Sequence, residues 1–451
     1  MAPTVRSFSA DLEPLALVAR FPEFYPGLLE SAAPVDAASG ANRFDILPIS
    51  CGECLRLDAD RRLSGPHAPS ASGFLDALES WWEALRTQAP AALPFSGGWL
   101  LYLGYELASE IEPRLKLPPS SDPLVALAIR TPAAWVRDRA NHRAWLIAEP
   151  GHEALLDRFA AHADSSSDSA AGAAVICSIE EEEPVRFLGA VLRSLEYIAA
   201  GDVYQANLSR LWQGRSPGRV DPVSIYRRLR ATNPSPFAAI MRFGDFALMS
   251  SSPERLMSIH GNTVSTRPIA GTRPRGESPA GDAALIKSLL ENEKERAEHV
   301  MLIDLERNDL GRVCVGGTVR VDEYMCVETY AHVHHIVSNV SGTLREGTSP
   351  VQVIRSLFPG GTITGCPKVR CMEIIAELEG TGRGAYTGSI GYLNRNGSCD
   401  LNILIRTISA HADTFRFRAG AGIVADSEPA QELAETRAKA KGLLRALDVS
   451  S

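Results

Sequence analysis

Residues 414–418 read TFRFR, so that two phenylalanines alternate with two arginines. Because successive side chains of a strand point to opposite faces, this alternation predicts a half-buried strand of an antiparallel sheet. Strand-like runs also occur earlier in the chain, at residues 246–250, 263–267, 318–324, 336–340, 389–393 and 401–408. The chain is therefore expected to be built on antiparallel sheets.

Helical patterns separate these strands at irregular intervals. Apolar residues between 185 and 198 recur at spacings of three and four and stop at Gly201, which predicts a helix. Further helices are expected at residues 73–85, 282–308, 350–357, 369–378 and 429–447. Since helices and strands do not alternate regularly, repeated parallel units are not indicated, and we expect an α+β fold.

One break in composition divides the chain. Residues 163–174 read ADSSSDSAAGAA, a polar stretch of small side chains that cannot bury enough apolar surface to become ordered. We therefore predict an N-terminal part of the fold at 1–162, a flexible loop or linker at 163–174, and the part with the candidate site at 175–451.

Charge and composition exclude several classes of protein. The 451 residues include 46 Lys and Arg against 54 Asp and Glu, a net charge of −8, which provides no field for binding nucleic acid or an anionic membrane. The chain shows neither a secretory signal pattern nor a run of roughly 20 apolar residues. The cysteines are scattered and do not form a disulfide pattern. We expect a cytoplasmic protein with reduced thiols and no nucleic-acid or membrane partner.

Two predicted helices each carry glutamates three residues apart, Glu295 with Glu298 and Glu432 with Glu435. This spacing places both carboxylates on one face of a helix. Four carboxylates converging from two helices would form an oxygen site suited to Mg²⁺. The same spacing also fits two solvent-exposed helix faces, so both interpretations remain open at this point.

Two glycine-rich turns follow strand patterns. Residues 420–426, GAGIVAD, contain G-x-G-x-x-A, but no βαβ unit surrounds them, so a dinucleotide site is not favoured. Residues 358–368, FPGGTITGCPK, have the glycine spacing of a phosphate loop without its Lys-Ser/Thr, so ATP is not indicated. The turns could bind an anion through backbone N–H groups, or they could be tight turns only.

Four polar residues occupy positions where the strand patterns favour apolar or indifferent ones: Gln205, Glu254, His335 and Arg406. A buried arginine needs an anionic partner, and a partly desolvated carboxyl such as that of Glu254 would have the raised pKa of a general acid. Each residue alone also fits a structural role. Together with the glutamate pairs, they indicate an enzyme for a small polyanionic metabolite that is bound by Mg²⁺ and one or two guanidiniums.

At these residues the chain resembles the chorismate-utilising enzymes. The resemblance is strong over 184–447 and weaker through LLES (28–31), RFDIL (43–47) and GGWLLYLGYEL (97–107). The motifs that carry it are GDVYQANLS, NPSPFAAIM, SSSPERL, RPIAGTRPRG, ERAEHVMLIDLERNDLGR, FPGGTITGCPKVRCMEIIAELE, GSIGYLN, and GAGIVADS followed by ELAETRAKA. The resemblance implies one large chorismate-binding domain, in which two antiparallel sheets pack as a sandwich with helices outside.

The resemblance also implies a nucleophile. Members of the family that add water have a lysine at the position of Gln205, whereas members that use ammonia have glutamine, so ammonia is expected. SSSPER, FPGG, VYQANL, NPSPF and VHHIVS resemble the aminodeoxychorismate synthase component I branch, which serves para-aminobenzoate and folate synthesis. Ala270 in PIAGT resembles the anthranilate synthase component I branch instead, and alanine excludes a covalent intermediate at that position. The first branch is our working hypothesis, and the second branch or a non-catalytic ligand-binding relative is the alternative.

Site roles follow from the same resemblance. It implies that Glu298 and Glu435 hold Mg²⁺, with Glu295 and Glu432 as ligands or close neighbours, and that Glu254 protonates the leaving hydroxyl. The other residues of the implied site are Gln205, Ala270, Thr272, His335, Thr364, Tyr386, Arg406, Gly420, Ala421, Gly422 and Lys439. Within that set, Arg406, Tyr386, Lys439 and the backbone of 420–422 would bind the pyruvyl carboxylate, and His335 and Thr364 would position the ring.

Two further expectations concern partners and regulation. The sequence lacks a Gly-x-Cys-x-Gly elbow, which predicts that a separate glutamine amidotransferase subunit delivers the ammonia. Leu29, Glu30 and Ser31 of LLES resemble part of the tryptophan pocket of anthranilate synthases. Here we expect an unregulated structural pocket rather than a feedback site.

Overall fold

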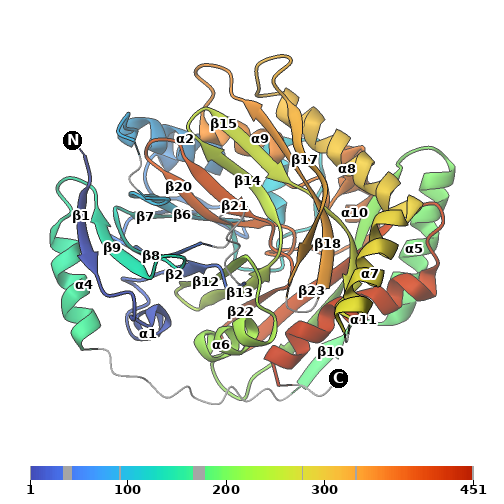
Figure 1. Cartoon of the computed structure of the whole chain (residues 1–451), viewed down its shortest axis with the longest axis horizontal. Coiled ribbons are helices and arrows are strands. Elements are labelled where there is room, and N and C mark those ends of the chain that lie inside the picture. Colours follow the sequence, from blue (N-terminus) through green and yellow to red (C-terminus); the bar gives the residue numbers. More distant parts are fainter. Residues whose placement is uncertain are drawn as a thin grey trace.

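The computed structural model describes residues 2–33, 43–90, 93–165, 178–276, 278–330 and 333–448. These residues form two large antiparallel sheets that pack against each other, with helices on the outer faces (Figure 1). The predicted α+β class and the sandwich of two antiparallel sheets are confirmed.

The first sheet contains 12 strands among the described residues. Their order is β1 (Thr4–Phe8), β9 (Arg143–Ala148), β8 (Ala133–Asp138), β3 (Phe44–Ile49), β2 (Gly27–Glu30), β12 (Phe237–Phe243), β13 (Phe246–Ser252), β22 (Thr407–His411), β23 (Thr414–Ile423), β11 (Gln205–Arg215) and β10 (Ser178–Glu181), with β19 (Gly365–Cys366) paired to β11. The alternating segment 414–418 is the first half of β23, as predicted.

The second sheet contains 11 strands among the described residues. Their order is β16 (Ile269–Pro274), β18 (Val333–Thr343), β15 (Thr263–Arg267), β14 (Arg255–His260), β21 (Cys399–Asn402), β20 (Ser389–Asn394), β6 (Gly98–Leu103), β7 (Leu124–Thr131), β4 (Cys54–Asp58) and β5 (Leu63–Ser64), with β17 (Arg320–Thr329) paired to β18. The pairings of β2 with β12 and of β6 with β20 show that both sheets contain strands from both parts of the chain.

Helices cover the outer faces of both sheets (Figure 1). The helices that share a core with the first sheet are α1 (Pro14–Arg20), α4 (Ala154–Asp164), α6 (Pro222–Thr232) and α11 (Pro429–Ala446). Those that share a core with the second are α2 (Phe74–Leu85), α8 (Glu293–Gly311) and α9 (Pro350–Leu357). The remaining helices are α3 (Ala108–Ile111), α5 (Pro184–Ala199), α7 (Pro279–Glu291), α10 (Lys368–Glu379), η1 (Ala68–Ser70) and η2 (Tyr105–Leu107).

Besides the two cores between each sheet and its helices, a third apolar cluster lies between the two sheets. Leu127 of the second sheet packs there with Met241 and Leu248 of the first, and all three side chains are fully buried.

No helix in the described part of the chain is long and apolar enough to cross a membrane. The cysteines that the structure describes are free thiols.

Two sequence predictions are wrong in the same way, because one continuous pattern hides a break. The helix predicted at 282–308 is two helices, since Asn292 leaves the helical conformation and its side chain caps α8 by accepting from the Glu295 N–H at 3.0 Å. The strand predicted at 401–408 is divided into β21 and β22, which belong to different sheets.

The predicted linker 163–174 falls outside the described residues from 166 onward, and residues 163 and 164 belong to α4.

The chain crosses between the two sheets several times, and two of these crossings are adjacent. It leaves β13 of the first sheet and enters β14 of the second through Pro253 and Glu254. It returns from β21 to β22 through residues 403–406, where Arg406 has a φ of 51°. The Ile403 N–H donates to the Glu254 carbonyl oxygen at 3.0 Å, and the Ser251 N–H donates to the Arg406 carbonyl oxygen at 3.1 Å. The crossings therefore hold Glu254 and Arg406 close together.

Candidate active site

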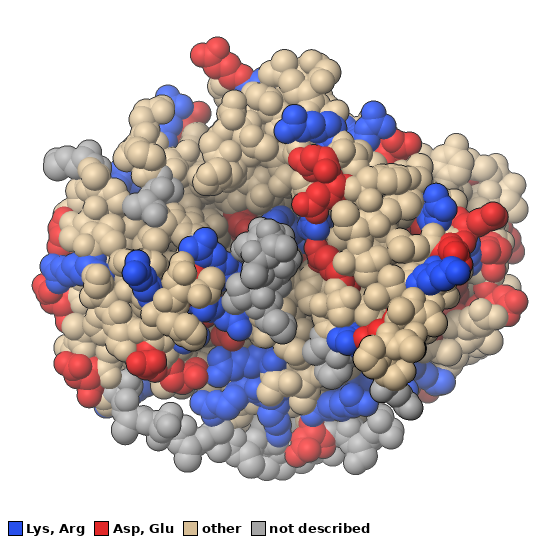
Figure 2. Space-filling view, viewed as in Figure 1, with Lys and Arg blue, Asp and Glu red and all other residues tan. Residues whose placement is uncertain are grey.

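A cavity of about 790 Å³ lies beside the two crossings, between the ends of the sheets and helices α8 and α11. The space-filling view shows a hollow near the middle of this face, with acidic and basic side chains at its edge (Figure 2). The predicted site residues that line the cavity are Gln205, Glu254, Ala270, Thr272, Glu295, Glu298, His335, Tyr386, Arg406, Gly420, Gly422, Glu432, Glu435 and Lys439. The fold thus gathers residues that are far apart in the sequence into one site.

Thr364 and Ala421 do not line the cavity. The Thr364 side chain is fully buried, and its hydroxyl donates to the Gly360 carbonyl oxygen at 2.9 Å. Ala421 packs in an apolar cluster with α5 and α10, because strand alternation turns it away from Gly420 and Gly422. Both residues are therefore packed behind the side chains that line the cavity.

Glu254 is a buried acid that faces the cavity, with 5% of its surface exposed. Burial raises its pKa to about 7, although the nearby Arg406 guanidinium favours the charged form. Its Oε1 atom has no hydrogen-bond partner among the described residues. Arg406 likewise makes no ion pair in the described part of the chain, and burial lowers its pKa. An acid with a raised pKa and a guanidinium thus face a space that suits a polar, anionic ligand.

His335 is neutral in this site. Its Nδ1 atom hydrogen-bonds the Thr272 hydroxyl at 2.9 Å, and its Nε2 atom is buried with no partner among the residues described. Burial and the Arg406 charge lower the pKa of His335 to about 3. The ring nitrogen is therefore available for a hydrogen bond with a ligand without adding charge.

The glutamates of α8 and α11 are held by separate partners. The Gln205 amide donates from Nε2 to Glu298 Oε1 at 2.7 Å. Glu295 pairs with Arg273 at 2.6 Å, and Glu435 pairs with Lys439 at 2.6 Å. A Cβ atom on Gly422 would lie 2.2 Å from Gln205 Nε2, so only glycine leaves room for the Gln205 side chain in this position.

The donor chemistry of these glutamates fits a divalent cation. Burial raises the pKa values of Glu298 and Glu432, and the negative charge of Glu435 raises both further. Glu295 Oε2 is buried without a hydrogen-bond partner within the described ranges. No three His, Cys, Asp or Glu side chains of the described residues are grouped closely enough to hold a metal ion together. A cation would therefore relieve the like-charge repulsion, but the side chains must move to bind it.

Sequence reasoning missed several residues of the cavity wall, among them Lys294, Tyr330, Thr362 and Arg418. Arg418 is 4% exposed and shares the buried Glu379 carboxylate with Arg383, at 3.2 and 2.7 Å. Two guanidiniums and one carboxylate leave a net positive charge beside the cavity, and this charge favours an anion there. Arg418 belongs to the segment TFRFR, and the argument applied to Arg406 would also have identified it.

A second cavity, of about 420 Å³, lies between the sheets and contains the LLES residues Leu29, Glu30 and Ser31 in its wall. The Ser31 hydroxyl donates to the Pro236 carbonyl oxygen at 2.6 Å. Burial raises the pKa of Glu30 to about 7 even though Arg230 lies 3.2 Å away. Pro253, Ile269 and Tyr330 line this cavity as well as the larger one. The two cavities therefore share a wall.

The sequence over residues 41–445 matches the family described as chorismate binding enzyme, and the chain belongs to that family. It is 43% identical over 394 residues to the aminodeoxychorismate synthase component 1 of Bacillus subtilis, covering 83% of this chain and 82% of that one. It is 39% identical over 464 residues to the anthranilate synthase component 1 of Thermus thermophilus, covering 99% and 98%.

A solved structure is similar over most of the chain. The crystal structure of anthranilate synthase component I from Streptococcus pneumoniae is 32% identical and has a TM-score of 0.80, covering 89% of this chain and 92% of that one. The family, predicted from the motifs, is therefore confirmed, whereas the relatives fall in both of the ammonia-using branches.

Replacing the buried acid tests its protonation state. The pKa of Glu254 rises from 4.5 to about 7 on folding, so its contribution to stability is present below pH 4.5 and is lost as the pH rises through 7. Glu254→Gln has no such loss. We expect the urea midpoint of the variant to exceed that of the wild type at about pH 8 but not at about pH 5.

The resemblance implies that Glu254 is the general acid; in that role, the same variant should lose roughly 10²- to 10⁴-fold of the rate of product formation from chorismate. Equal pH dependence of stability in the two proteins would contradict a raised pKa for Glu254.

Proposed function

We propose that the protein is an aminodeoxychorismate synthase component I, which converts chorismate and ammonia to 4-amino-4-deoxychorismate. The observation that carries the proposal is the buried Glu254, whose pKa is raised to about 7, beside an Arg406 that makes no ion pair among the described residues, in one cavity with four further carboxylates. Chorismate has two carboxylates and a ring hydroxyl, so it needs cationic partners and an acid for the leaving group. The motifs SSSPER, FPGG, VYQANL and NPSPF favour this branch of the family.

The second candidate is anthranilate synthase component I. Ala270 lines the cavity at the position where a lysine nucleophile occurs in many aminodeoxychorismate synthases. Alanine supplies no nucleophile, so the route has no enzyme-bound intermediate at this position. Ammonia would then attack the ring directly or through successive additions. The alanine at this position is the feature that favours the second candidate.

Cationic groups on one side of the cavity would bind the pyruvyl carboxylate. Arg406 offers a guanidinium that pairs with no acid in the described ranges, and Lys439 Nζ lies 3.0 Å from the Gly420 carbonyl oxygen. A Cβ atom on Gly420 would lie 2.5 Å from the Tyr386 hydroxyl, so glycine lets this tyrosine approach the strand. Arg406, Tyr386 and Lys439 would together orient the enolpyruvyl arm of chorismate.

The glutamates of the same cavity, of which Glu435 pairs with Lys439, would bind the ring carboxylate through Mg²⁺. Glu298 and Glu435 would hold the ion, with Glu295 and Glu432 as further ligands or close neighbours. When bound, Mg²⁺ would neutralise the ring carboxylate and draw electron density from the ring. Gln205, which donates to Glu298, would orient that ligand and leave its own Oε1 free to accept from ammonia.

Glu254 would then act as the general acid. Its proton passes to the departing ring hydroxyl, the carbon–oxygen bond breaks, and water leaves. Neutral His335 would hold the ring through Nε2 without competing with Glu254 for the proton. Ammonia would come from a separate glutamine amidotransferase subunit, as the component names of the relatives in Bacillus subtilis and Thermus thermophilus support.

Product identity tests the branch. With chorismate, Mg²⁺ and an ammonium salt, the purified chain should form 4-amino-4-deoxychorismate, identified by liquid chromatography and mass spectrometry. Glu254→Gln is the matched control and should form almost none. Accumulation of fluorescent anthranilate would overturn the branch assignment and support the second candidate.

The nitrogen source tests the partner. The purified chain should use ammonium salts but not glutamine, because no amidotransferase elbow occurs in its sequence. Addition of the glutamine amidotransferase subunit from the same organism should restore the use of glutamine. Turnover of glutamine by the chain alone would show that the predicted partner is not required.

Tryptophan tests the second cavity. We propose that this cavity is structural, since Glu30 is engaged by Arg230 and Ser31 by the Pro236 carbonyl. Calorimetry should therefore detect no heat of tryptophan binding, and tryptophan should leave the amination rate unchanged. Inhibition that disappears in a Ser31→Leu variant would instead identify a feedback site.

A further inference from the structure

Glu306 of α8 is a buried acid for which the proposed reaction has so far had no role. It is 4% exposed, and burial raises its pKa to about 7. The Thr266 hydroxyl and the Gly361 N–H hydrogen-bond its carboxyl group, and it makes no ion pair among the described residues. Burying an acid without a paired cation lowers stability, so a purely structural role would be served better by a neutral side chain.

On one side, Glu306 lies close to the catalytic cavity. A Cβ atom on Gly361 would lie 3.1 Å from Glu306 Oε1, so the backbone of the 358–368 turn touches this carboxyl. The next residue, Thr362, lines the cavity beside Glu254. The two acids are also close enough for the charge of Glu306 to raise the pKa of Glu254.

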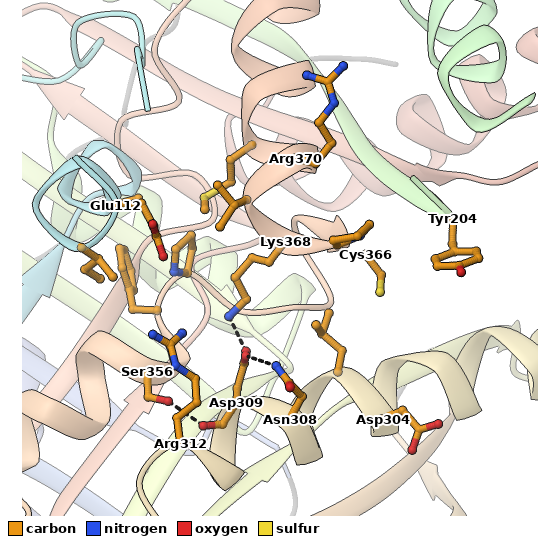
Figure 3. A pocket seen from close by; sticks show the side chains of 18 of the residues that line it. Glu112, Tyr204, Asp304, Asn308, Asp309, Arg312, Ser356, Cys366, Lys368 and Arg370 are labelled. Carbon is orange, nitrogen blue, oxygen red and sulfur yellow. Dashed lines mark hydrogen bonds and ion pairs between the residues drawn. The ribbon is translucent and has the colours of Figure 1, made fainter. Parts of the chain in front are cut away.

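On its other side, Glu306 lies next to Asp309. The two residues are three positions apart on α8, so their side chains share one face of the helix. Asp309 lines an outer cavity of about 800 Å³ between α3, α8, α9 and α10. There Lys368 Nζ lies 2.5 Å from Asp309 Oδ2, and Asn308 donates to Asp309 Oδ1 at 3.4 Å (Figure 3). Glu254, Glu306 and Asp309 therefore form a row of acids between the two cavities.

The proposed reaction consumes one proton of Glu254 in each turnover, so a path that returns a proton to this residue is needed. The bond between the ring carbon and the hydroxyl oxygen breaks with its electron pair on oxygen, which takes the Glu254 proton to form water. Ammonia forms the new carbon–nitrogen bond, and the product amine leaves as an ammonium group. Chorismate, ammonia and one proton thus become the product and water. Glu254 must regain one proton in each turnover.

We propose that Glu306 returns this proton to Glu254 and is itself recharged from solvent at Asp309 and Lys368 in the outer cavity. Glu306 does not touch the reacting atoms, and it acts through Glu254. The charged groups that face it are Glu254, Asp309 and Lys368. This role rests on the function proposed above, and the row provides a path for protons while substrate fills the catalytic cavity.

Glu306→Gln tests the relay, because it keeps the shape of the side chain and removes the transferable proton. We expect kcat for ammonium-dependent amination to fall about tenfold or more, with KM for chorismate unchanged. Reprotonation of Glu254 should become rate-limiting, so the solvent deuterium isotope effect on kcat should increase. Glu306→Asp, which keeps a carboxyl group, should restore most of the rate and a smaller isotope effect.

Glu106→Gln is the matched control. Glu106 is 1% exposed and burial raises its pKa to about 7, but backbone N–H groups of Arg383 and Gly384 hold it away from the row. This variant should keep the wild-type kcat and isotope effect. A wild-type isotope effect in Glu306→Gln, or an equal change in Glu106→Gln, would overturn the relay.

Asp309→Asn gives an independent test at the outer end of the row, in case Glu306→Gln does not fold. It should also increase the solvent isotope effect, and an unchanged isotope effect would overturn the relay. If the wild type does not aminate chorismate at all, the proposed function fails before the relay is tested, so the two failures are distinguishable.

Discussion

The site depends on the cost of burying charge at two adjacent crossings between the sheets, from β13 to β14 and from β21 to β22. At these crossings Glu254 is buried and Arg406 half-buried in the cavity wall, where water cannot solvate them fully. Backbone hydrogen bonds between the crossings, from Ile403 to Glu254 and from Ser251 to Arg406, hold the residues in place. Desolvation at this place then determines the chemistry, because it raises the pKa of Glu254 to about 7 and leaves Arg406 in need of an anion.

Helix α8 gives the site its second charged wall. Its N-terminal half directs Glu295 and Glu298 into the catalytic cavity, opposite the glutamates of α11. Its C-terminal half places Asp309 in the outer cavity, with Glu306 buried between the two. A single helix therefore separates two cavities and carries acidic groups toward both. Packing of its apolar residues against the second sheet holds these groups in place despite their mutual repulsion.

The buried acids of this protein differ in what surrounds them. Glu106 is held by two backbone N–H groups and Glu30 by the Arg230 guanidinium, which suits a structural role. Glu254 instead has an oxygen without a partner among the described residues, and Glu306 lies between two other acids. Burial and the raised pKa values are thus similar in all four acids, and the different roles proposed for them rest on the contacts of each carboxyl group.

Local periodicity in the sequence was enough to predict the α+β class, several of the helices and strands, and the glutamate pairs, because three-residue spacing and strand alternation depend only on neighbouring residues. The motifs identified the family. The break at Asn292, the crossing before Arg406 and the inward position of Arg418 depend on contacts between distant segments, so the pattern of 401–408 was misinterpreted as one strand. Only the tertiary structure brought Glu254 next to Arg406, turned Thr364 and Ala421 away from the cavity, and aligned Glu306 between two cavities, because burial and its effect on charge arise from packing.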